Sequence, residues 1–186
     1  MNSDELFQYM VRDPDRARCE LSLLDFTKQA WPALEPGVQF VHGWAVEAVA
    51  EHLQAVTEGH IKRLLVNVPP GCTKSMLTNV MWPAWEWGPR KKPHYRYISA
   101  SYEQGLAVRD MVRCRDLVKS EWYHSRWPIE PKDDQDAKTF YANTATGGWR
   151  PLHGSAFSNC PASENSTSSA AKRAANCTPI GRPDSL

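Results

Sequence analysis

The sequence has no apolar run approaching the roughly 18 residues that a transmembrane helix requires. It also has almost no excess of charge, because 22 Lys and Arg face 21 Asp and Glu, so a polyanion must be met by a local patch. The five cysteines include no C-x-x-C pair, which argues against a zinc site and a disulfide framework. The N-terminus lacks the basic and then apolar pattern of a signal peptide. We therefore expect a soluble protein of a reducing compartment, with no membrane partner.

Composition changes sharply near residue 150. All eight tryptophans lie before this point, and residues 151–186 are dominated by Ser, Ala, Asn, Thr and Pro. So few large apolar side chains cannot offset the entropy of ordering that segment, which predicts a disordered C-terminal tail. We divide the chain into an N-terminal extension (1–19), one ordered region (20–150) and this tail (151–186).

The ordered region alternates helical and strand-like patterns. Apolar spacing predicts helices at 20–30 (ending before Pro32), 44–57, 75–88 and 102–120, strands at 61–68 and 95–101, and a hairpin at 138–150 that turns near Gly147 and Gly148. Strand, turn, helix, strand, helix is the opening of a parallel sheet with flanking helices, so the fold class is α/β.

The most informative segment is LLVNVPPGCTKSMLTNV, residues 64–80. A strand that runs through a Pro-Pro-Gly turn into a helix is the setting of a phosphate-binding loop, in which backbone N–H groups surround the phosphates. Lysine then contacts the terminal phosphates and the neighbouring hydroxyl ligates magnesium. The predicted ATP site is Gly71, Cys72, Thr73, Lys74 and Ser75, with Ser75 as the Mg²⁺ ligand.

The strict pattern G-x-x-x-x-G-K-[ST] is not met. Its two glycine positions hold Val68 and Thr73, and Gly71 is the only glycine of the loop. An ordinary strand–turn–helix junction, with a surface lysine and a serine at the helix start, stays open as the alternative.

A longer pattern resembles a known family. The segments FTKQAWPALEPGVQFVHGWAVEAVAEHL, RLLVNVPPGCTKS, WPAWEW, YISASYEQGLAVRD and VRCRDLVKSEWY, and then DDQDAKTFYANTATGGWR, follow the order and spacing of the N-terminal ATPase region of large terminase subunits from tailed bacteriophages and prophages. The resemblance covers about two thirds of the chain, and it depends on the combination of motifs.

The resemblance implies a P-loop NTPase fold, here partial, in a motor that uses ATP and Mg²⁺ to drive double-stranded DNA into a prohead. It implies Lys74 as the phosphate-binding lysine of a Walker A loop, Ser75 as the magnesium ligand, and a small terminase subunit and a portal as partners. It also implies the cytoplasm of a bacterial host as the location. Loops of this family tolerate replacement of the glycine before the lysine, as in Thr73.

Two features of the family are not found in the sequence. Many relatives carry an arginine at the position of Gly71, and a strand ending in paired acidic residues normally follows the hairpin. No apolar run after residue 150 ends in Asp or Glu, and no nuclease domain follows. We assign no catalytic residue and expect a truncated or frameshifted product.

A local basic excess runs through residues 90–119, where Arg109 and Arg113 share a helix face at i,i+4. These arginines are candidate DNA contacts, and a solvated helix face is the alternative. For the whole chain, the rival hypotheses are a non-catalytic remnant that binds a nucleotide or another subunit, a product without function, and a small P-loop kinase.

Overall fold

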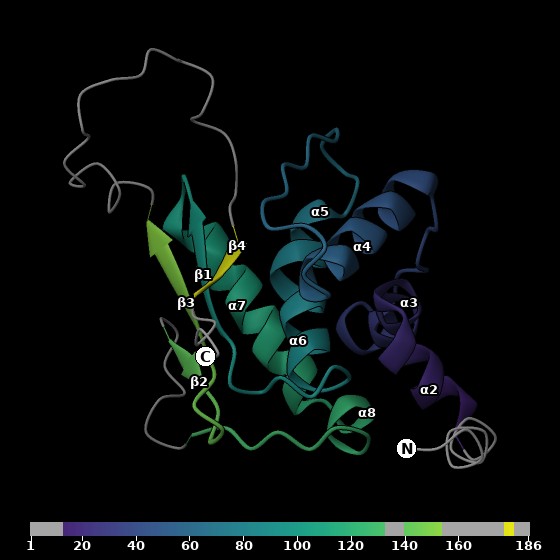
Figure 1. Ribbon diagram of the computed structural model, residues 1–186, viewed down its shortest axis with the longest axis vertical. Helices are drawn as coiled ribbons and strands as arrows, with labels where there is room; N and C mark the ends of the chain where they lie inside the picture. The colour runs from purple at the N-terminus through teal and green to yellow at the C-terminus, as the bar shows by residue number, and fades with distance from the viewer. Residues whose placement is uncertain (1–12, 133–139, 154–176, 181–186) are drawn as a thin grey trace.

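The computed structural model describes residues 13–132 and 140–153 and the backbone of residues 177–180. The fold is mixed α/β, as Figure 1 shows. The helical elements are α2 (Pro14–Leu21), α3 (Leu23–Leu34), α4 (Trp44–Thr57), α5 (Lys74–Met76), the π-helix η1 (Leu77–Met81), α6 (Trp82–Trp87), α7 (Gln104–Lys119) and α8 (Glu121–His124). The strands are β1 (Arg96–Ser101), β2 (Tyr141–Ala142), β3 (Gly148–His153) and β4 (Cys177–Ile180). No helix in these described ranges is long and apolar enough to cross a membrane.

The strands form one sheet in the order β2-β3-β1-β4. β1 and β3 are parallel, with Arg96 opposite Gly148 and Ser101 opposite His153. Helix α7 follows β1 and packs on both strands of this parallel pair, which is the crossover arrangement that parallel strands require. β2 and β4 run antiparallel to their neighbours, so the sheet is mixed and not wholly parallel as predicted.

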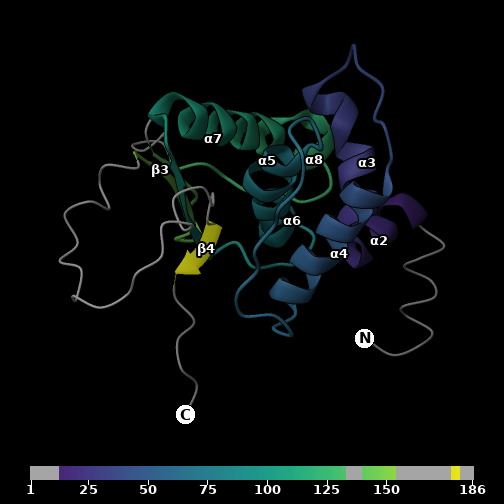
Figure 2. The ribbon, with the colours of Figure 1, turned by 90° about the horizontal axis from the view of Figure 1, so that it is seen from above.

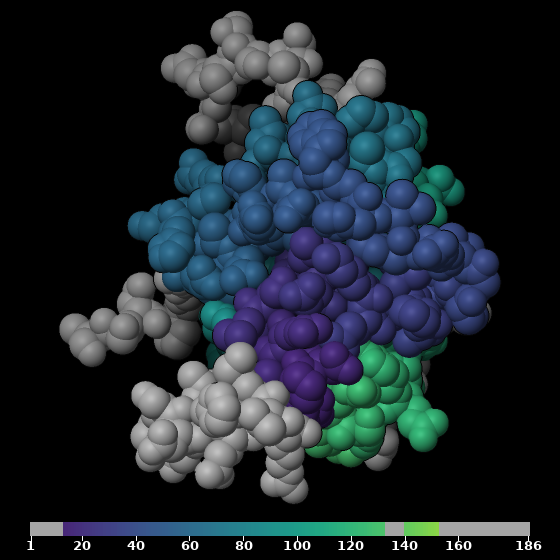
Figure 3. All heavy atoms as spheres, turned by 90° about the vertical axis from the view of Figure 1, so that its right-hand side faces the viewer, coloured from purple at the N-terminus to yellow at the C-terminus, as the bar shows by residue number. Residues whose placement is uncertain are grey.

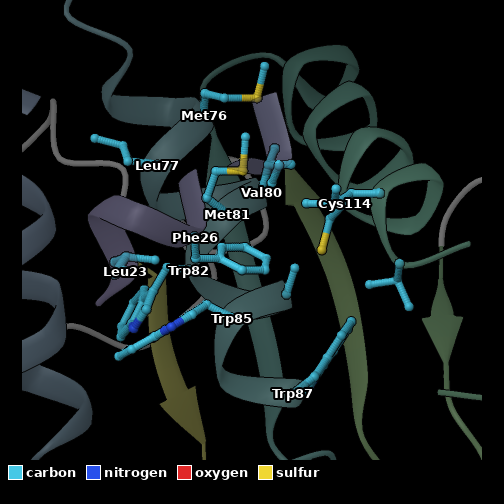
Figure 4. Close-up of a cluster of buried hydrophobic side chains, with 14 of the residues drawn as sticks. Leu23, Phe26, Met76, Leu77, Val80, Met81, Trp82, Trp85, Trp87 and Cys114 are labelled. Carbon is cyan, nitrogen blue, oxygen red and sulfur yellow. The ribbon is translucent and has the colours of Figure 1, made fainter. Parts of the chain in front are cut away.

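The core lies between the sheet and the N-terminal helices. Figure 2 shows α7 beside the sheet, α5 and α6 at the centre, and α2, α3 and α4 together on the far side. Leu23 and Phe26 of α3 meet the buried side of the 74–87 helix and Cys114 of α7 (Figure 4). Trp82, Trp85 and Trp87 are all buried there, so the tryptophans of this helix serve packing.

The segment 61–68 is not a strand, and the strand prediction was wrong. Its side chains do alternate, with Leu64, Val66 and Val68 packed against the core and Leu65 78% exposed. A strand also needs a hydrogen-bonded neighbour, and both edges of β1 are already occupied, by β3 and by β4. The β-branched residues therefore give an extended backbone outside the sheet.

Three predicted boundaries also differ. Helix α2 begins at Pro14, inside the predicted extension 1–19, and its Cys19 belongs to the core. Helix α3 passes through Pro32, because proline removes only its bond to the carbonyl of Lys28, a residue exposed to water. Residues 151–153 belong to β3 and residues 177–180 form β4, both within the segment predicted to be disordered; the remainder of that segment lies outside the described residues.

The predicted hairpin is present, as β2 and β3 joined by the turn 143–147. Asn143 closes this turn, because its Oδ1 accepts from Gly147 N at 2.8 Å and its Nδ2 donates to Pro93 O at 2.8 Å. A Cβ at position 147 would overlap the Pro93 carbonyl oxygen, so the turn requires glycine.

Helix α6 also carries a buried acidic residue between two of its tryptophans. Glu86 is 1% exposed and accepts a hydrogen bond from the buried Tyr97 hydroxyl. Burial raises the pKa of the Glu86 carboxyl, and the bond from Tyr97 and the charges of Lys92 and Arg90 oppose that rise only in part. The folded chain therefore keeps the Glu86 proton to a higher pH than the unfolded chain does.

We expect Glu86→Gln to reduce the pH dependence of stability. The unfolded carboxyl titrates near pH 4.3, so above that pH the unfolded chain loses a proton that the folded chain keeps. The Glu86 contribution is thus complete below about pH 4.3 and is lost, at up to about 1.4 kcal/mol per pH unit, as the pH rises through the raised pKa of the folded state. Urea unfolding of both proteins from pH 4 to 8 measures it. Glu51→Gln, at an exposed site of α4, is the control, and identical pH profiles for parent and Glu86→Gln would refute the assignment.

Candidate functional site

The predicted phosphate loop is a turn between the extended segment 61–68 and a helix that starts at Lys74. Two of its residues have left-handed backbone, Gly71 at φ 88° and Thr73 at φ 57°. Glycine adopts this conformation freely, whereas a β-branched residue does so with strain. Thr73 thus occupies the left-handed position at the site where the strict loop pattern has its second glycine. Gly71 could not become arginine without similar strain.

Lys74 and Ser75 form the first turn of the helical segment, both half-buried. Thr73 is the N-cap but gives no side-chain capping bond, so the first N–H groups of the helix remain open to an external acceptor. Within the part of the chain that the structure describes, no carboxylate lies within ion-pair distance of the Lys74 ammonium. A lysine and a hydroxyl beside open backbone N–H groups can receive a phosphate and its Mg²⁺.

The helix that follows is not regular. Residues 77–81 form the π-helix η1, a wider turn that places Asn79 on the buried side together with three apolar residues. The Thr78 hydroxyl donates to the Lys74 carbonyl at 2.9 Å, so the first turn is tied to η1. π-Helical turns are rare, and they occur frequently at functional sites.

The candidate DNA contacts Arg109 and Arg113 lie on α7, and each has an acidic partner. Arg109 donates through Nε (3.1 Å) and a terminal nitrogen (2.9 Å) to Oδ1 of Asp110, and its side chain is 52% exposed. Arg113 pairs with Glu35 at the end of α3, at 3.0 Å. The two arginines are therefore accessible but partly neutralised, which sequence spacing did not reveal.

The structure brings together two residues that the sequence analysis missed. Asn79 of η1 donates to Oδ2 of Asp110 on α7 at 2.9 Å, and both residues are about 5% exposed. Each is a polar residue on an otherwise apolar helix face, and this was the available signal. A buried hydrogen bond to a carboxylate fixes the relative position of the two helices.

A surface depression lies elsewhere. It encloses about 430 Å³ and is lined by Asp15, Arg18, Asp25, Lys28, Gln29, Trp122 and Arg126. It lies where α2 and α3 meet α8, on the face that Figure 3 presents, and the predicted loop does not contribute to it. Residues 69–71 are exposed and residues 72–75 are half-buried, so the predicted loop lies at the surface.

Among the described residues, no three His, Cys, Asp or Glu side chains gather into a metal-binding group. A magnesium ion at Ser75 would thus take its remaining ligands from a nucleotide and water, as this ion commonly does. Comparison of the chain with protein-family models, with curated proteins and with solved structures found no match.

Proposed function

We propose that this chain is the ATP-binding motor region of a large terminase subunit, acting in the packaging of double-stranded DNA into proheads. The proposal rests on the order of the motifs that resemble that family, from the segment at residue 26 to the hairpin at residue 150. It implies a partial P-loop NTPase domain, ATP and Mg²⁺ as ligands, and the bacterial host cytoplasm as the location.

One structural observation supports it most directly. The loop reaches Lys74 through a left-handed Thr73, and Lys74 and Ser75 then open a helix whose first N–H groups lack a side-chain cap. With a nucleotide bound, the Lys74 ammonium and the backbone donors would hold the γ- and β-phosphates, and the Ser75 hydroxyl would be a ligand of Mg²⁺. Gly71 and Cys72 supply the backbone of the turn.

The DNA partner follows from α7. Arg109 and Arg113 present half-exposed guanidinium groups one helical turn apart, a spacing that suits successive contacts to a phosphate backbone. A DNA phosphate must compete with Asp110 and Glu35 for them, so we propose salt-sensitive, sequence-independent binding. The small terminase subunit and the portal are the protein partners that the resemblance adds.

The position of residues 61–68 outside the sheet favours a second function. Residues 61–68 lie outside it and β4 occupies the edge of β1, so the loop is not anchored by a strand of the sheet. A loop held in this way suits a module that binds a nucleotide or another terminase subunit without catalysis. Binding without turnover distinguishes this alternative from the motor.

The test of the proposed function is nucleotide binding that depends on Lys74. We expect Lys74→Ala to weaken a fluorescent ATP analogue about 10- to 100-fold, because a charge-assisted hydrogen bond to phosphate contributes about 1.5–3 kcal/mol. Fluorescence titration with and without Mg²⁺ measures it, and Ser75→Ala should lose most of the Mg²⁺ effect.

The matched control is Lys62→Ala, which removes an exposed lysine from the segment leading to the loop and should bind like the parent. Equal affinity of Lys74→Ala and the parent would show that residues 69–75 are an ordinary turn.

A further inference from the structure

We propose that Asn79 and Asp110 are positioning residues that couple occupancy of the loop at Lys74 to the availability of Arg109 for a polyanion. The inference rests on the proposed function and adds to it a pair of residues that link its two ligands. It starts from a continuous set of polar contacts that joins the loop to the exposed face of α7.

The first half of this set runs along one helix. The Thr78 hydroxyl donates to the Lys74 carbonyl at 2.9 Å and lies 3.4 Å from Oδ1 of Asn79. The single hydroxyl proton of Thr78 serves the Lys74 carbonyl, so Lys74 is linked to the inward-facing Asn79 through the backbone that joins Thr78 to Asn79. A displacement of the first helical turn changes the contacts of Asn79.

The second half crosses to α7. The two oxygens of the Asp110 carboxylate have different partners, since Oδ2 accepts from Asn79 at 2.9 Å and Oδ1 accepts from Arg109 at 2.9 and 3.1 Å. Both donors share the charge of one buried carboxylate, so loss of the bond from Asn79 leaves Asp110 more dependent on Arg109. The position of Asn79 thus sets how strongly Asp110 holds Arg109.

The coupling requires that the π-helix η1 can take two arrangements. A π-turn and an α-turn of the same residues differ by one residue in their hydrogen bonding, so a shift between them moves Asn79 relative to α7. Phosphate bound to the backbone N–H groups at Lys74 shifts the equilibrium between the π-turn and the α-turn. An anion that draws Arg109 away from Asp110 shifts the same equilibrium. Coupling of this kind is reciprocal, so either ligand changes the affinity for the other by the same factor.

The experiment compares the affinity of the 186-residue chain for a fluorescent ATP analogue and Mg²⁺, with and without a short DNA duplex. We expect the duplex to change the parent's Kd at least about fivefold, the lower end of common coupling energies. Asp110→Asn should bring the ratio of the two Kd values, with and without duplex, close to one. The asparagine amide accepts only on its oxygen, so it cannot accept from Asn79 and from Arg109 on separate atoms.

The informative variant is the exchange of Asn79→Asp together with Asp110→Asn. It restores the hydrogen bond between η1 and α7 with donor and acceptor reversed, and it takes the carboxylate away from Arg109. We expect the melting temperature to recover and the coupling to stay lost. Asp116→Asn is the control, since Asp116 pairs with its neighbour Arg115 on the same helix at 3.3 Å but is largely exposed.

Each result decides the matter. Lys74-dependent binding with a ratio of one in the parent overturns the coupling and leaves the proposed function intact. A parent-like ratio in the exchange variant shows that the Asn79–Asp110 bond is only structural. Absence of Lys74-dependent binding in the parent overturns the proposed function, and the coupling with it.

Discussion

Replacing Trp85 by alanine should destabilise the protein by about 3–5 kcal/mol, the range found for large aromatic residues of packed cores. The Trp85 side chain is fully buried, and its indole N–H donates to the Cys19 carbonyl at 2.7 Å. The substitution removes a large apolar side chain and leaves that buried carbonyl without its donor. Because small domains are stable by only about 5–15 kcal/mol, a substantial part of the margin is lost.

A pair of gentler substitutions separates the two effects. Trp149 in β3 is equally buried, but its indole nitrogen has no hydrogen-bond partner among the residues that the structure describes. Trp85→Phe should therefore lower the free energy of unfolding by about 1–3 kcal/mol more than Trp149→Phe does. The first substitution breaks a buried hydrogen bond, and the second removes a donor that has no partner in the described ranges. Urea unfolding followed by circular dichroism measures both. Equal losses would mean that the bond from Trp85 to Cys19 contributes nothing.

Local patterns predicted the longer helices, which have long apolar faces, but not α2 or α8. The expected helix at 44–57 is α4, the expected strand at 95–101 contains β1, and the expected helix at 102–120 contains α7. The segment 61–68 was misjudged for a physical reason, since propensity specifies an extended backbone but not the neighbour that makes it a strand. That neighbour position beside β1 is held by β4, whose Ser- and Thr-rich surroundings carried no strand signal.

The candidate site shows the same division. The turn chemistry of residues 69–75 could be predicted from the chain, and the left-handed conformation of Thr73 agrees with the position of a glycine in the loop pattern. The partners of the site could not be predicted. Asp110 is 31 residues from Asn79 and Arg113 is 78 residues from Glu35, so only the packing of α7 against η1 and α3 brings them together.

The largest effect we expect concerns turnover: the 186-residue chain should release phosphate no faster than Lys74→Ala, whatever it binds. Hydrolysis needs a carboxylate that orients water and positive charge on the γ-phosphoryl group in the transition state. The strand that completes the hairpin is β3, Gly148–His153, and it contains no Asp or Glu. Many members of the resembled family carry an arginine at the position of Gly71. This chain has a glycine there, with φ 88°. An arginine finger alone contributes about 10³–10⁵ in rate in related P-loop enzymes.

A neighbouring subunit can supply an arginine, but it cannot readily supply an acidic residue on a strand inside this sheet. A phosphate-release assay with and without duplex DNA, with Lys74→Ala as the background, therefore tests whether the sheet lacks a catalytic carboxylate as well as whether the loop binds ATP. Lys74-dependent turnover of about 1 per second or faster, within the ordinary range of enzymes, would contradict the prediction. Asp133, Asp134 and Asp136, which lie outside the described residues, are then the first carboxylates to replace by asparagine, because they precede the hairpin that carries β3.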